Sequence, residues 1–197
     1  MKELLTMTIA ASLALSMSVA PAPEPEPYED IMAIMISAVV AGDTAAGIDA
    51  GRRRSEKIAE QGLDNVDIDF NELNLLSKIM YAEAGSYWLS DEIKLGVGEV
   101  VLNRVASPEF PDTMLEVLEQ PGQYYGKNSW YFNNIRPDER CVKLALRLLE
   151  GERNFESSVV FQANFRQGSG VHASFFDQHL GWTYFCYSSR PELYYEA

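Results

Sequence analysis

The strongest constraint on this chain is a helical repeat of apolar residues that ends on an acidic residue. Apolar side chains recur at intervals of three and four residues, the period of a helix with one buried face. The members of this stripe are Leu73, Leu76, Ile79 and Met80. Glu83 continues the stripe, so a helix that starts with Asn71 as its cap and ends near Gly85 would carry Glu83 in its last turn.

A carboxyl group in the last turn of a helix is in an unfavourable place for a negative charge. The helix C-terminus carries partial negative charge, and the rings of Tyr81, Tyr87 and Trp88 could strip water from the Glu83 carboxyl. Both effects favour the protonated form and predict a raised pKa, which suits a general acid. The alternative interpretation is a partly exposed glutamate whose stem covers the edge of the core.

Composition and motifs exclude several classes of function. The chain has 197 residues and a formal net charge of −13, which argues against binding to nucleic acid. No glycine loop for phosphate is present, and His172 and His179 lack partners at metal-ligand spacing, so we expect neither a cofactor nor a metal. Cys141 fits a core position of a helix, and whether it pairs with Cys186 stays open.

The first 70 residues read as an export signal followed by a spacer. Residues 1–22 combine one lysine, a long apolar run and small residues suited to cleavage, so we expect a signal peptide; an uncleaved membrane anchor is the alternative. Residues 23–70 read as a proline-rich spacer and a poorly defined N-terminal region. Within it, residues 31–41 predict a short buried or interfacial helix, and residues 42–69 a linker or poorly ordered segment. Residues 71–197 are the expected catalytic domain.

The rest of the chain predicts an α+β domain. Further helices are expected over residues 91–105, 112–118 and 136–149. Residues 158–163 and 183–187 are rich in β-branched and aromatic side chains, and we expect them to pair as a small antiparallel ribbon beside the helices.

Amide and aromatic side chains accompany Glu83 and are the usual lining of a sugar-binding groove. Amides pair with hydroxyl groups, and rings cover the apolar faces of pyranoses. The candidate substrate-binding residues are Tyr81, Glu99, Asn103, Gln123, Tyr124, Gln162 and Asn164. Most glycosidases use two carboxylates, and Glu99 is the candidate for the second. If Glu83 acts alone, the substrate itself must supply the nucleophile.

Several sequence blocks in fixed order resemble the cell-wall hydrolase family of spore cortex-lytic enzymes. The blocks span residues 79–84 (IMYAEA), 98–105 (GEVVLNRV), 107–108 (SP), 110–113 (FPDT) and 120–124 (QPGQY). A fainter similarity continues through residues 160–162 to residues 184–185, so the resemblance covers roughly residues 72–188. Many relatives carry a Gly-x-His-x-Phe element, whereas this chain has Thr183 at the histidine position.

The resemblance implies a mostly helical, lysozyme-like α+β fold that cleaves peptidoglycan glycan strands between N-acetylmuramic acid and N-acetylglucosamine. It implies that Glu83 is the catalytic acid of a lytic transglycosylase or a muramidase. The enzyme would act outside the cytoplasm, in the cell wall or spore cortex, during sporulation or germination. We expect a monomer, with an accessory wall protein as a possible partner. The alternatives are a hydrolytic muramidase with a second carboxylate, a non-catalytic wall-binding protein, and an amidase or peptidase that cleaves the stem peptide.

Overall fold

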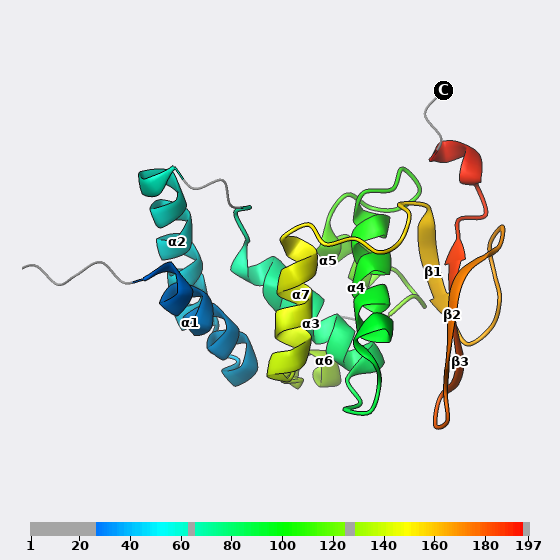
Figure 1. Ribbon diagram of the computed structural model, residues 1–197, viewed down its shortest axis with the longest axis horizontal. Helices are drawn as coiled ribbons and strands as arrows, with labels where there is room; N and C mark the ends of the chain where they lie inside the picture. Colours follow the sequence, from blue (N-terminus) through cyan, green and yellow to red (C-terminus); the bar gives the residue numbers. More distant parts are fainter. Residues whose placement is uncertain (1–26, 63–65, 125–128, 195–197) are drawn as a thin grey trace, which may run out of the picture.

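The computed structural model describes residues 27–62, 66–124 and 129–194, which form helices with one small sheet (Figure 1). The helices are α1 (Tyr28–Ala41), α2 (Thr44–Gln61), α3 (Phe70–Ala84), α4 (Asp91–Val105), α5 (Met114–Glu119), α6 (Trp130–Asn134) and α7 (Glu139–Leu149). The strands are β1 (Val159–Ala163), β2 (Val171–Asp177) and β3 (Gly181–Tyr187), followed by a 3₁₀ turn at Pro191–Leu193. The predicted α+β class is therefore confirmed, while the predicted signal peptide at residues 1–22 lies outside the described residues.

The elements are arranged in layers along the long axis of the molecule. Figure 1 shows the α1–α2 hairpin at one end and the sheet at the other, with α3, α4 and α7 between them. Helix α7 packs against α1, α3 and α4, and α4 packs against β1 and β3. The main core therefore extends from the N-terminal hairpin to α4 and α7, and a smaller cluster of Val100, Val159 and Phe185 joins α4 to the inner face of the sheet.

Helix α1 is part of this core. Ile31, Met35 and Val39 are buried in the same apolar cluster as Leu73 and Leu76 of α3. The predicted helix over residues 31–41 is thus confirmed as a buried one. We therefore propose that the folded unit begins at α1 and not at residue 71.

The prediction of a linker or poorly ordered segment over residues 42–69 is wrong for its larger part. Asp43 caps α2 by accepting a hydrogen bond from the Ala46 amide at 3.0 Å. Gly47 faces the Phe70 ring so closely that a Cβ on it would lie 2.0 Å from ring carbons. Glycines that read as a flexible linker in the sequence therefore form the surface on which α2 meets the start of α3.

The sheet contains the predicted ribbon and one strand more. Strands β1 and β3 pair antiparallel, as predicted, with Gln162 opposite Phe185. Strand β2, which the sequence reading missed, pairs antiparallel with the other edge of β3, so the spatial order is β1-β3-β2. Histidine, alanine and serine interrupt the β-branched and aromatic pattern of β2, which explains why local propensity did not reveal it.

Helix α4 lies in the middle of the layers and is buried all round over much of its length. Every residue from Ile93 to Val101 is buried. Four polar side chains of this helix are also buried, and each binds neighbouring backbone or side-chain groups. These residues are Lys94, Glu99, Asn103 and Arg104.

Two further findings concern the membrane and the cysteines. Among the described residues, no helix combines the length and apolar character needed to span a bilayer. Cys141 on α7 and Cys186 on β3 are both buried and free, and Cys141 occupies the predicted core position.

Candidate active site

Glu83 lies, as predicted, in the last turn of α3, where its side chain is half-buried. Residues three and four apart share a face of a helix, so Glu83 lies on the face of Ile79 and Met80, which are fully buried. Tyr81 is two residues away and therefore does not face the same side as Glu83. The structure thus places Tyr81 beside the helix end without directing it to the Glu83 carboxyl.

The ends of α3 are held differently from the prediction. Asp69, and not Asn71, caps the helix, because its carboxylate accepts hydrogen bonds from the amides of Asn71 and Glu72. Gly85 has φ of −69°, so the helix does not end through a left-handed glycine. Instead, Lys94 of α4 donates hydrogen bonds to the Ala84 and Ser86 carbonyl oxygens.

Tyr124 shares the local environment of Glu83. Burial is the main cause that raises the pKa of Tyr124 to about 12; the nearby Arg104 cation opposes this rise, and the Glu83 carboxylate adds to it. Tyr124 therefore keeps its proton near neutral pH and can donate a hydrogen bond. Its hydroxyl has no partner among the described residues, and its ring lies 5.1 Å from the Arg104 guanidinium.

Two other predicted site residues serve the fold and do not line the site. Glu99 is fully buried, and its carboxylate accepts hydrogen bonds from the Asn154 amide, the Asn154 side chain and the Phe155 amide, each at 2.7 Å. Asn103 is also buried and donates to the carbonyl oxygens of Glu156 and Val159. The assignment of Glu99 and Asn103 to substrate binding is therefore corrected, because both are occupied in fixing the segment that leads into β1.

The remaining predicted residues lie on the sheet and on a loop. Gln123 and Asn164 are exposed. Gln162 is opposite Phe185, and Thr183 is two residues from Phe185 on β3, so both share the face on which Phe185 is buried. Gln162 and Thr183 are half-buried and face the helical layer.

The turn after α3 also touches the sheet. The Trp88 ring contacts the His179 ring in the β2–β3 turn, with 5.2 Å between centroids. The hairpin end that carries Thr183 is therefore next to the turn that follows Glu83. Tyr87 is 82% exposed, so its ring contributes little to the predicted desolvation of the Glu83 carboxyl.

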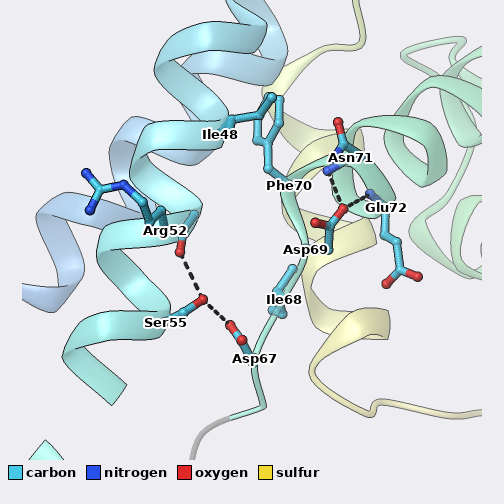
Figure 2. Close-up of a pocket in the computed structure, with 10 residues that line it drawn as sticks. Ile48, Arg52, Ser55, Asp67, Ile68, Asp69, Phe70, Asn71 and Glu72 are labelled. Atoms are coloured by element: carbon cyan, nitrogen blue, oxygen red, sulfur yellow. Dashed lines mark hydrogen bonds between the residues drawn. The ribbon is translucent and has the colours of Figure 1, made fainter. Parts of the chain in front are cut away.

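A separate cavity lies at the opposite end of α3. Figure 2 shows this cavity, of about 400 Å³, between α2 and the start of α3. Three of its polar side chains are already bound within the protein: Ser55 donates to Asp67 at 2.8 Å, and Asp69 caps α3. Glu83 is thirteen residues further along the helix than Phe70, or about 20 Å at 1.5 Å per residue. The cavity is therefore not part of the Glu83 site.

Acidic, histidine and cysteine side chains are the usual protein ligands of metal ions, and the described ranges contain all three kinds. Among these residues, no group of three or more such side chains is placed to hold an ion. His172 instead pairs with the Tyr187 hydroxyl at 3.0 Å.

The comparison with protein families agrees with the resemblance seen in the sequence. Residues 90–183 match the model of the cell wall hydrolase family, from the cap of α4 to the middle of β3. This part of the chain is therefore similar to that family. The match supports an enzyme that acts on the cell wall, with peptidoglycan as its substrate class and an extracytoplasmic place of action.

The matched segment begins after part of the candidate site. Glu83 and Tyr81 precede the matched segment, whereas Gln123, Tyr124 and Gln162 lie inside it. No curated protein and no solved structure matches the chain, so the likeness to lysozyme stays a prediction.

Glu99→Gln is expected to destabilise the protein by about 2 to 3 kcal/mol, because an amide would present N–H groups to backbone donors that now bind a carboxylate. Urea unfolding followed by circular dichroism measures this loss. Glu92→Gln is the matched control on an exposed position of the same helix and should change stability by less than about 0.5 kcal/mol. A stable Glu99→Gln protein without activity would contradict the structural role and restore Glu99 as a second catalytic carboxylate.

Proposed function

We propose that this protein is a peptidoglycan lytic transglycosylase that cleaves between N-acetylmuramic acid and N-acetylglucosamine with Glu83 as its catalytic acid and base. The observation that carries this proposal is that the Glu99 carboxylate is buried and already hydrogen-bonded within the protein. The second carboxylate that the sequence offered accepts hydrogen bonds from the 154–155 segment and is fully buried. This arrangement disfavours a hydrolytic muramidase that uses Glu83 and Glu99 as a pair.

The reaction balances with one carboxyl group. Protonated Glu83 gives its proton to the glycosidic oxygen, and the bond between that oxygen and C1 of the muramoyl residue breaks. The Glu83 carboxylate then accepts the proton of the muramoyl C6 hydroxyl while O6 bonds to C1. The products are a 1,6-anhydromuramoyl end and a free 4-hydroxyl on N-acetylglucosamine, with Glu83 protonated again and no water consumed.

The surroundings of Glu83 suit a sugar substrate. Tyr124 keeps its proton, and its buried hydroxyl has no partner among the described residues, so it could donate to a sugar oxygen or an acetamido carbonyl once substrate binding exposes it. Gln162 and Thr183 contribute polar groups on the inner face of the sheet, and the exposed Gln123 and Asn164 would form the rim. Thr183 stands at a position where many relatives have histidine, so the proposed mechanism assigns no role to a histidine there.

Mass spectrometry of digested peptidoglycan tests the proposal. Anhydromuramoyl ends, lighter by one water than reducing ends, are the expected product. Reducing muramoyl ends would establish a hydrolytic muramidase, free stem peptides an amidase or peptidase, and intact strands after binding a non-catalytic wall protein. A role in the spore cortex, sporulation or germination, a monomeric state and an accessory wall protein are further parts of the proposal, supported by the family resemblance alone.

A further inference from the structure

A buried lysine binds the backbone of the turn that follows Glu83. Lys94 is in the first turns of α4 and is fully buried. Its ammonium donates to the Ala84 carbonyl oxygen in a short hydrogen bond and to the Ser86 carbonyl oxygen at 3.0 Å. Ala84 directly follows Glu83, so Lys94 binds the backbone on the C-terminal side of the proposed acid.

These hydrogen bonds replace the usual end of a helix. The last carbonyl groups of an α-helix have no partner inside the helix, and a left-handed glycine often supplies one. Gly85 stays right-handed here, and Lys94 takes the terminal carbonyl instead. Arg140 of α7 adds a bond to the Tyr87 carbonyl oxygen at 2.9 Å. Cations from two helices thus bind three carbonyl groups of the turn that follows Glu83.

The charges around Lys94 do not include a hydrogen-bonded carboxylate among the described residues. Burial is the main cause that lowers the pKa of Lys94; Arg140 lowers it further, while Cys141, Asp138 and Asp91 raise it. Of these groups, Arg140 is already paired with Asp91 at 2.7 Å, and Asp138 caps α7 through the Cys141 amide. Backbone carbonyl groups are therefore the direct partners of the Lys94 ammonium.

We propose that Lys94 is a positioning residue for Glu83: its ammonium fixes the turn after α3 and offsets the partial negative charge at the C-terminus of the helix that carries Glu83. This inference rests on the proposed function of Glu83. It also changes the sequence-based expectation of a raised Glu83 pKa, because a cation at the helix C-terminus opposes the effect of the helix dipole on Glu83.

The sign of the expected effect follows from this geometry. A cation at a helix C-terminus offsets the partial negative charge there and so favours the charged form of a carboxyl group in the last turn. Replacement of Lys94 by a neutral residue should raise the Glu83 pKa by about half a unit to one unit. The step that needs protonated Glu83 should then persist to higher pH, and the alkaline limb of the activity profile should move in the same direction.

The experiment measures the Glu83 pKa directly by carbon-13 NMR of its side-chain carboxyl, in the wild type, Lys94→Gln and Lys94→Met. Glutamine keeps N–H donors without the charge, whereas methionine removes both. We expect a raised Glu83 pKa in both variants, with a kcat loss of about 10- to 100-fold in Lys94→Met and little change in KM. Lys143→Gln removes an exposed lysine charge from α7 and should leave the Glu83 pKa unchanged.

An unchanged Glu83 pKa in folded Lys94→Gln would overturn the inference. If both variants fail to fold, a titration of the wild type tests the inference. The Glu83 carboxyl resonance should then shift a second time at the pH where Lys94 loses its proton. A single titration step would overturn the inference. These outcomes are separate from the proposed function, because the Glu83 titration is measured without any substrate. Retained activity in Glu83→Gln would remove Glu83 from the mechanism even if its titration responds to Lys94.

Discussion

Glu83→Gln is expected to fold like the wild type and to lose about 10²- to 10⁴-fold of its activity on purified peptidoglycan. The amide is nearly isosteric with the carboxyl group but cannot give a proton to the leaving glycosidic oxygen. Release of soluble fragments from insoluble peptidoglycan measures the loss, and thermal unfolding confirms that the variant is folded.

Glu72→Gln is the matched control for this variant. It makes the same change on the same helix, but at an exposed position in the first turn of α3. Its activity should stay close to that of the wild type. Near-wild-type turnover in a folded Glu83→Gln protein would show that another residue is the acid.

Met35→Asp is expected to remove most of the stability of the protein. Met35 has no exposed surface and lies in the main core with α3 residues, so an aspartate there would bury a charge without a partner. Such a change costs about 3 to 5 kcal/mol, against about 5 to 15 kcal/mol for a whole domain. Chemical denaturation of the chain that starts at residue 27 measures the loss.

Ser37→Asp tests whether the effect comes from the core and not from charge on α1. Ser37 is exposed on the same helix, and the change should alter stability by about 0.5 kcal/mol or less. If Met35→Asp were as stable as Ser37→Asp, α1 would not belong to the folded unit, and the boundary predicted at residue 71 would hold.

The sequence revealed elements whose side-chain period is regular. Helix α4 begins and ends at the predicted residues 91 and 105, and β1 and β3 pair as predicted. Helix α2 was missed because its glycines resemble a linker until Phe70 is seen against Gly47. Strand β2 was missed because it is specified by pairing with β3, which is a contact distant in sequence.

Only those features of the site that depend on a local sequence pattern could be predicted. The position of Glu83 in the last turn followed from the apolar stripe of α3. The partners of Glu99 lie 55 and 56 residues away, so no local pattern could show that its carboxylate is occupied. Lys94 had one signal: it falls in a stretch of α4 without a polar face, where a lysine must find a buried partner.

The buried polar side chains of α4 have a consequence for the order in which the chain can become structured. Glu99, Asn103 and Arg104 bind backbone groups between residues 154 and 160, and Lys94 binds those of the turn at residues 84–86. Neither segment contains these partners for its own backbone groups, so we expect each segment to stay loosely ordered until α4 has formed. We therefore expect protection from amide exchange to appear in α4 before it appears at the start of β1 during refolding. The reason is that α4 supplies the side chains that bind the backbone of the sheet edge and of the turn after Glu83.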